Sequence, residues 1–96
     1  MIYEWDPTKA ADSERKHGVS FDEAATVFRD PLAETFDDPD HSIDEPRFIT
    51  IGESTQRRLL FVAHADRGVD RVRIISVRTT TRGETNAYQH RKTKRQ

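Results

Sequence analysis

Arginines, a glutamate and a tyrosine gather in one stretch of the sequence, residues 71–88. Arg71, Arg73 and Arg78 bracket a run of mostly β-branched residues, and Glu84 and Tyr88 follow, four residues apart. A β-branched run predicts a strand, and a spacing of four places two side chains on the same helix face. Guanidinium groups bind phosphate oxygens, and Glu and Tyr side chains can transfer protons. Together these residues indicate chemistry on a phosphodiester.

The elements that position these residues follow from local patterns. The strand predicted over residues 69–77 carries apolar residues on both faces, which is typical of an interior strand. Thr81, followed three residues later by Glu84, has the spacing of a capping box and predicts the start of a helix. We therefore expect a rigid strand that displays arginines and leads directly into a C-terminal helix.

Start and stop signals predict two further helices near the N-terminus. Asp6 is the expected N-cap of the first, with proline at the next position, and Gly18 supplies its left-handed end. Ser20, with Glu23 three residues later, predicts the start of the second. The Asp-Pro pair at residues 30–31 ends it.

Strand signals occur five times along the chain. In order they cover residues 2–5, 32–36, 47–51, 58–64 and 69–77. Turn-forming residues separate the last three strands, which predicts antiparallel hairpins. We predict an α+β domain with a small antiparallel β-sheet packed by two N-terminal helices and one C-terminal helix. The domain is expected to span residues 1–90, and the basic residues 91–96 are expected to form a frayed tail.

Composition limits the class of protein. Of the 96 residues, 33% are apolar and 34% are charged, so we expect one domain with a thin core. The absence of cysteine excludes disulfides, thiolate zinc sites and thiol catalysis. No apolar run approaches the roughly 18 residues of a membrane span, and the first residues do not form a signal peptide. A soluble, cytoplasmic protein is expected.

Charge is unevenly distributed along the chain. Residues 1–56 hold 5 Lys and Arg against 14 Asp and Glu, whereas residues 57–96 hold 11 against 3. One interpretation is a surface that attracts a polyanion. The alternative is that the two halves neutralise each other across the folded domain.

An ordered set of short motifs extends over almost the whole chain. The set comprises Trp5-Asp6-Pro7, Lys16-His17-Gly18-Val19-Ser20-Phe21, Asp30-Pro31, Glu45-x-Arg47, Gly52, Arg73-Ile74-Ile75-Ser76-x-Arg78 and Glu84-x-x-x-Tyr88. In this order, over residues 2–88, the motifs resemble those of the BrnT toxins of bacterial type II toxin–antitoxin systems.

The resemblance implies a fold similar to that of the RelE ribonucleases. It implies a metal-independent endoribonuclease that inhibits translation and needs no cofactor. It also implies a cognate BrnA-type antitoxin with a ribbon-helix-helix part, through which the complex would bind operator DNA. The alternative from another functional class is a catalytically silent interaction module that only completes a repressor complex.

Cleavage of RNA without metal begins when the ribose 2′-oxygen attacks the adjacent phosphorus. Charge on the phosphoryl oxygens must then be stabilised, and arginine suits this task because it binds two oxygens at once and stays charged. Arg73 and Arg78 are the first candidates, and Arg47 is the third. The alternative is that these arginines pair with some of the 17 acidic residues of the chain.

The candidates for proton transfer are Lys16, His17, Glu84 and Tyr88. Histidine near its ordinary pKa can act as acid or base. Each candidate also has a structural interpretation: His17 can cap the end of a helix, Glu84 can complete a capping box, and Tyr88 can belong to the core.

Three other histidines receive no catalytic role. His41 lies among acidic residues whose spacing does not match an EF-hand calcium loop, so we interpret that segment as a solvated acidic turn without metal. His64 and His90 are interpreted as incidental. No cofactor or metal site is expected.

Overall fold

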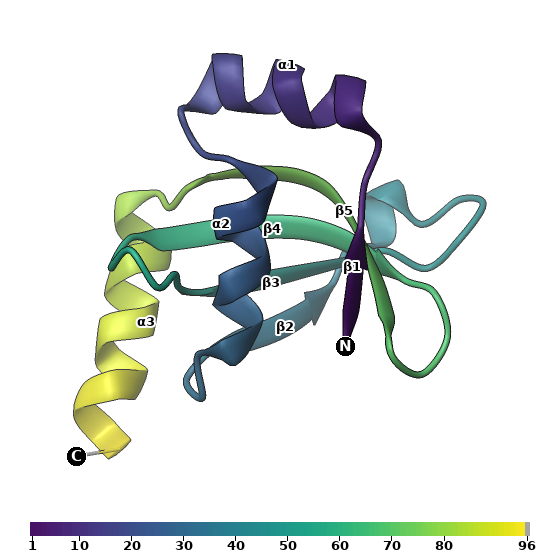
Figure 1. Ribbon diagram of the computed structural model, residues 1–96. Coiled ribbons are helices and arrows are strands. Elements are labelled where there is room, and N and C mark those ends of the chain that lie inside the picture. The colour runs from purple at the N-terminus through teal and green to yellow at the C-terminus, as the bar shows by residue number, and fades with distance from the viewer. Residues whose placement is uncertain (96) are drawn as a thin grey trace.

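The computed structural model describes the backbone of residues 1–95 and the side chains of residues 1–94. Its elements are β1 (Ile2–Glu4), α1 (Pro7–His17), α2 (Phe21–Thr26), β2 (Glu34–Asp37), β3 (Phe48–Glu53), β4 (Leu59–Asp66), β5 (Arg71–Thr79) and α3 (Arg82–Arg95) (Figure 1). Short 3-10 turns cover residues 27–29 and 39–41. The α+β prediction is confirmed, and the strands β2 to β5 each begin one or two residues later than predicted.

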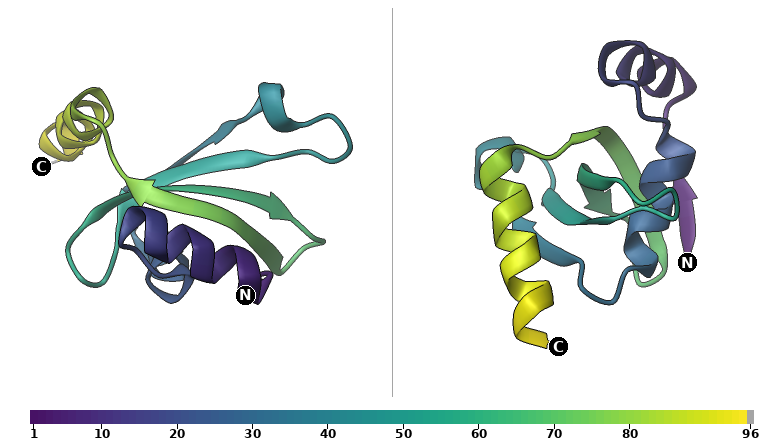
Figure 2. Two further views of the ribbon diagram at one scale, coloured as in Figure 1. Left: turned by 90° about the horizontal axis from the view of Figure 1, so that it is seen from above. Right: turned by 90° about the vertical axis from the view of Figure 1, so that its left-hand side faces the viewer.

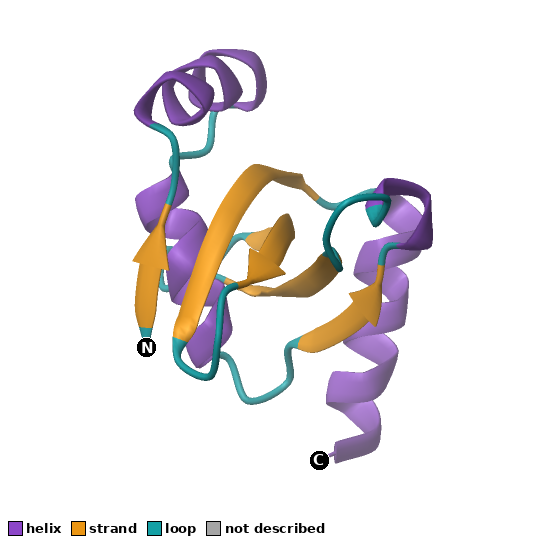
Figure 3. Cartoon of the chain, turned by 90° about the vertical axis from the view of Figure 1, so that its right-hand side faces the viewer, coloured by secondary structure: helices purple, strands orange, loops and turns teal. Residues whose placement is uncertain are grey.

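The five strands form one sheet in the order β1-β5-β4-β3-β2. β5 is an interior strand, as predicted, and the pairs β2–β3, β3–β4 and β4–β5 are antiparallel. The prediction of an antiparallel sheet is wrong for β1, which pairs with β5 in parallel, Ile2 opposite Arg71 (Figure 3). Hairpin signals describe only strands that are close in sequence, whereas residues 5–70 separate β1 from β5.

Local capping interactions fix the starts of the helices. The Asp6 carboxylate accepts a hydrogen bond of 2.8 Å from the backbone N–H of Thr8, and the Ser20 hydroxyl accepts one of 3.0 Å from that of Glu23. Thr81 and Glu84 form the predicted capping box through bonds of 2.8 and 3.2 Å. Gly18 ends α1 with a φ of 72°.

The basic C-terminal segment continues α3 as far as Arg95. Fraying of this segment stays a prediction, and Gln96, which the predicted tail included, lies outside the described residues. In the described part of the chain, no helix has the length and apolar character needed to cross a membrane.

The core lies between one face of the sheet and the helices α1 and α2. Its buried members are Val19, Phe21, Ala24, Val27, Leu60, Val62, Val72, Ile74 and Val77. α3 stands on the other side of the sheet from α2, near one end of the strands (Figure 2). The part of the sheet face that the helices leave uncovered is therefore open to ligands.

A bulge in β5 changes which residues face the core. The β4–β5 register places Ala63 opposite Ser76 but His64 opposite Ile74, so Ile75 is an additional residue on β5. Side chains alternate between the faces of a strand, and one additional residue reverses the alternation. Ile74 and Val77 consequently both face the core, although they lie three residues apart.

Candidate active site

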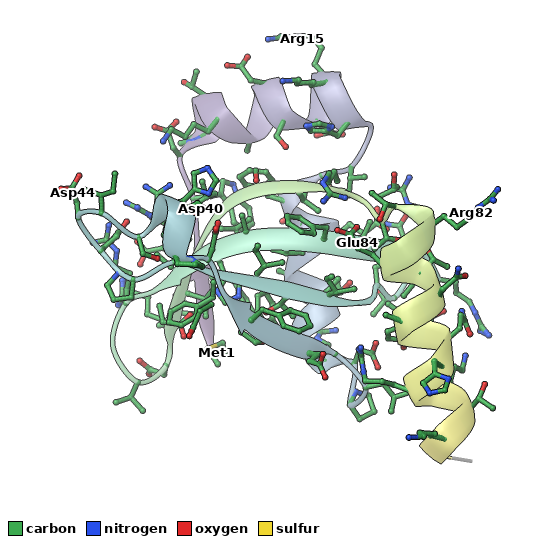
Figure 4. All side chains as sticks on the ribbon, turned by 180° about the vertical axis from the view of Figure 1, so that it is seen from behind. Met1, Arg15, Asp40, Asp44, Arg82 and Glu84 are labelled. Carbon is green, nitrogen blue, oxygen red and sulfur yellow. The ribbon has the colours of Figure 1, made fainter. Side chains whose placement is uncertain are left out.

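A shallow groove lies on the open face of the sheet, opposite the core. Its central hollow has a volume of about 230 Å³. The lining residues come from β3, β4, β5 and the acidic loop before β3: Asp38, His41, Arg47, Ile49, Phe61, Ala63, Ile75 and Ser76. The acidic loop, with Asp40 and Asp44, and the start of α3, with Arg82 and Glu84, lie at opposite ends of the molecule (Figure 4).

Arg78 and Glu84 form an ion pair beside the α3 end of the groove, where Arg78 contacts the lining residue Phe61. Two guanidinium nitrogens of Arg78 donate hydrogen bonds of 2.9 and 3.0 Å to the two carboxylate oxygens of Glu84. The guanidinium carbon also lies 3.7 Å from the ring centroid of Phe61, so the cation stacks on an aromatic face. The bonds from Arg78 lower the pKa of Glu84. Glu84 is therefore an ionised carboxylate at neutral pH, held beside a fixed arginine.

Glu45 and three arginines form a cluster at the other end. Arg73 donates a hydrogen bond to one Glu45 oxygen. Arg67 lies 3.5 Å from the other oxygen, and Arg47 lies 3.9 Å from the first. The interpretation that the arginines pair with carboxylates therefore describes their state in this structure.

The bulge places Arg73 and Arg78 on the same face. Arg73 and Arg78 lie five positions apart in the sequence, and in a regular strand such an odd spacing places two side chains on opposite faces. The additional residue Ile75 reverses the alternation between them and returns both to one face. Their partners on β4 are Ala65 and Phe61, four residues apart, so at about 3.3 Å per residue the two positions lie roughly 13 Å apart. They can therefore contact two different groups of an extended ligand but not the same group.

Lys16 and His17 lie outside the groove. They occupy the last turn of α1, where their side chains are exposed. This end of α1 lies on the same side of the molecule as the start of α3 (Figure 1). Neither side chain is bonded to Arg78 or Glu84 in the described part of the chain.

Tyr88 lies in the interior rather than in the groove. It is only 2% exposed, and its hydroxyl donates a hydrogen bond to Asp30. Burial, followed by the bond to Asp30, raises the pKa of Tyr88. The structural interpretation of Tyr88 therefore describes its position, and we assign it a role in holding α3 in place.

His41 is a groove residue to which sequence analysis gave no role. Its exposed ring nitrogen Nδ1 lies 3.0 Å from a carboxylate oxygen of Asp38. The local spacing indicated only an acidic turn, because nothing in it shows that the turn folds against β4 and β5. Among the described residues, no group of three or more metal-ligating side chains is arranged to hold an ion.

Comparisons with known proteins identify the family of this chain. A family model described as the ribonuclease toxin BrnT of type II toxin–antitoxin systems matches residues 5–84. The chain belongs to this family. The matched region contains both ends of the groove, and the BrnT resemblance found in the sequence motifs is thereby confirmed.

The crystal structure of the Brucella abortus ribonuclease toxin BrnT is similar to this BrnT-family chain. The TM-score is 0.66 at 22% identity, and the match covers 85% of this chain and 100% of that one. At this identity the likeness supports the fold alone. A comparison with curated proteins gives no match. The likeness to the RelE ribonucleases stays a prediction.

Proposed function

We propose that this BrnT-family chain is a metal-independent endoribonuclease that inhibits translation. The observation that carries the proposal is the ion pair of Arg78 and Glu84 at the α3 end of the groove, with Arg73 on the same face. An arginine that binds phosphate and a carboxylate that accepts a proton are the two groups needed to begin internal attack.

In the proposed mechanism, Arg78 binds the non-bridging oxygens of the scissile phosphate. The ionised Glu84 takes the proton from the ribose 2′-hydroxyl as the 2′-oxygen forms its bond to phosphorus. The bond from phosphorus to the 5′-oxygen breaks, and that oxygen receives a proton from His17 or Lys16. The products are a 2′,3′-cyclic phosphate and a 5′-hydroxyl. Arg73 and Arg47 bind neighbouring parts of the strand.

We further propose a BrnA-type antitoxin with a ribbon-helix-helix part as the partner, which connects the complex to operator DNA. The excess of positive charge in residues 57–96 supports a partner segment of negative charge. The proposed site of action is the cytoplasm, where the RNA substrate and the antitoxin would both be present.

Cleavage of a single-stranded RNA in excess EDTA tests the catalytic proposal. We expect cleavage to continue and to leave 2′,3′-cyclic phosphate and 5′-hydroxyl ends. A requirement for Mg²⁺, or products with 5′-phosphates, would contradict the mechanism. If no condition gives cleavage but the antitoxin binds tightly, the silent interaction module is favoured instead. The pairing of Arg47, Arg73 and Arg78 with carboxylates also supports that alternative.

A further inference from the structure

One carboxylate is surrounded by three arginines from three different segments. Glu45 belongs to the acidic loop, whereas Arg47 precedes β3, Arg67 lies in the turn between β4 and β5, and Arg73 lies on β5. We call Arg47, Arg67 and Arg73 the arginine cluster. Three positive charges share this one carboxylate, although Asp40 and Asp44 line a hollow beside Glu45 and Arg47. A phosphate can carry more negative charge and more acceptor oxygens than the carboxylate that it would replace.

The arginine cluster also has unused hydrogen-bond donors. The 3.9 Å separation between Arg47 and Glu45 is too long for a hydrogen bond. The Nε atom of Arg47 is buried and has no hydrogen-bond partner in the described part of the chain. A buried donor without a partner is unfavourable, so a change of the Arg47 side chain that brings this donor to a ligand oxygen would be stabilised. Glu45 therefore fills the site only in part.

The loop that carries Glu45 is held weakly at the cluster. Its base is closed by a backbone bond of 2.9 Å from Asp38 to Arg47. Within the described residues, the other hydrogen bonds of residues 39–46, apart from those of Glu45, stay inside the segment 38–47. Ile43, at the exposed part of the loop, is 88% exposed and does not anchor it to the core. The contacts of Glu45 are thus its main tie to β5.

These contacts are of a kind that a ligand can replace. The side chains of Glu45, Arg73 and Arg67 are 28%, 31% and 45% exposed. Ion pairs at such positions are screened by solvent and contribute little free energy of their own. A phosphate presents more oxygens than a carboxylate and matches the fork of each arginine equally well.

We propose that the arginine cluster is a binding site for a backbone phosphate of the RNA, and that Glu45 occupies it as an intramolecular competitor in the free protein. This inference rests on the proposed function for the identity of the ligand. The site is distinct from Arg78, because the bulged strand separates Arg73 from Arg78 by roughly 13 Å, four residues of β4 at about 3.3 Å each. A single strand laid along the groove would place one phosphate at each end.

The test measures binding separately from cleavage. The probe is a fluorescent 2′-O-methyl oligoribonucleotide, which has the phosphates of RNA but no 2′-hydroxyl to attack. Its dissociation constant is measured by anisotropy for the wild type, Glu45→Gln and Asp44→Asn. Asp44→Asn is the matched control, because it removes the same charge from the same exposed loop, and Asp44 makes no ion pair within the described residues.

We expect Glu45→Gln to tighten binding of the oligonucleotide by roughly tenfold, because the arginine donors that Glu45 occupies become available to a phosphate. Asp44→Asn should change it by no more than about twofold, since an exposed charge is screened. The slope of log K against log salt should steepen by about 0.7 in Glu45→Gln, as expected for one additional phosphate contact by a single strand. Arg67→Ala should weaken binding of the oligonucleotide. The double variant that combines Glu45→Gln with Arg67→Ala should lose most of the affinity that Glu45→Gln alone gains.

Several outcomes would overturn the proposal. Equal effects of Glu45→Gln and Asp44→Asn would show only a general charge effect. Unchanged binding by Glu45→Gln together with loss of cleavage would instead make Glu45 a proton acceptor. Gain of affinity for a decaglutamate peptide but not for the oligonucleotide would assign the cluster to an acidic protein segment. If Glu45→Gln does not fold, unchanged binding by Arg67→Ala would still contradict the proposal. Because the probe cannot be cleaved, the outcomes that concern binding alone do not depend on whether the wild type cleaves RNA.

Discussion

The hydroxyl of Tyr88 donates a hydrogen bond of 2.7 Å to the carboxylate of Asp30. The same carboxylate accepts bonds from the backbone N–H groups of Leu32, at 2.9 Å, and Glu53, at 2.8 Å. Burial alone would raise the pKa of Asp30, but these three bonds outweigh it and lower the pKa. One carboxylate thus connects α3, the segment after α2 and the end of β3.

Tyr88→Phe is expected to destabilise the protein without removing catalysis. Loss of the hydroxyl removes one buried hydrogen bond to a charged group, which lowers the free energy of unfolding by about 1–3 kcal/mol. Urea unfolding and cleavage by the folded variant measure the two effects. Tyr3→Phe is the control, because the Tyr3 hydroxyl has no hydrogen-bond partner among the described residues. A hundredfold loss of cleavage in folded Tyr88→Phe would give Tyr88 a chemical role.

Arg78→Ala is expected to reduce kcat/KM by about 10²–10³, the effect of removing one group that stabilises transition-state charge. The midpoint of thermal unfolding should change little, since a partly exposed ion pair contributes about 1 kcal/mol or less. Arg82→Ala is the matched control at the exposed start of α3, where Arg82 makes no ion pair within the described residues. Nearly full activity of Arg78→Ala would leave Arg78 with only its pairing role.

Gly52→Ala is expected to destabilise the fold. A Cβ atom at this position would lie 2.8 Å from Cβ of Ala33 and 3.0 Å from Cγ1 of Val27. Such overpacking lowers the free energy of unfolding by about 1–3 kcal/mol. The control is Gly83→Ala in α3, where a Cβ meets nothing within 4 Å. It should raise stability by up to about 1 kcal/mol, because alanine favours a helix. Denaturant midpoints measure both, and equal effects would contradict the packing argument.

Stability should fall as the pH decreases through about 6.5, the ordinary pKa of histidine. Burial lowers the pKa of His64, although the nearby Asp66 carboxylate acts in the opposite direction. Between the unfolded and folded pKa values, the unfolded chain binds a proton that the folded chain does not, so acid favours unfolding. The loss is at most about 2 kcal/mol at pH 5.

Urea unfolding between pH 5 and pH 8 measures this loss. His64→Gln should remove the dependence near pH 6.5, whereas the exposed His90→Gln should retain it. The same pH dependence in His64→Gln as in the wild type would place its origin elsewhere. The pKa values of Glu23, Asp30 and Glu84 are lowered in the folded protein. The stability that these carboxylates contribute is lost in a separate pH range, as the pH falls below their ordinary pKa values of 3.8–4.5.

Association with the proposed antitoxin should be faster at low salt. Opposite charges attract over the Debye length, about 8–10 Å at physiological ionic strength, and added salt screens them. Arg82→Glu should slow association while the free toxin retains its cleavage. Stopped-flow measurements over a range of salt concentrations test this. Rates that do not depend on salt would place the partner on another surface. An apolar surface formed by Phe21 and Phe28, in and after α2, is not available for this partner. Phe21 is only 2% exposed, and the ring of Phe28 already stacks on Tyr3.

The sequence predicted those features of the fold that depend on neighbouring residues. Asp6, Ser20 and Thr81 each bind backbone N–H groups two or three positions away, so their patterns are visible in a short window. The parallel pairing of β1 has no such local pattern. The bulge at Ile75 contains no glycine, and the adjacent apolar residues Ile74 and Ile75 are equally consistent with an interior strand that is apolar on both faces.

The candidate site was predictable as residue types but not as an arrangement. Arg78 and Glu84 lie six positions apart, and their pairing follows from a strand that leads directly into a helix. The contact of Glu45 with Arg73 depends on how a long loop folds back over the sheet, which no spacing indicates. Tyr88 shares a helical segment with Glu84, yet its position is decided by Asp30, 58 residues earlier in the chain.

The parallel pair of β1 and β5 has a consequence for the order of folding. β1 ends at Glu4, and its partner strand begins only at Arg71. Contacts between such distant residues require closure of a long loop and form late. A nascent chain without β5 also lacks Arg73 and Arg78. The arrangement therefore delays the appearance of the groove until β5 has been made.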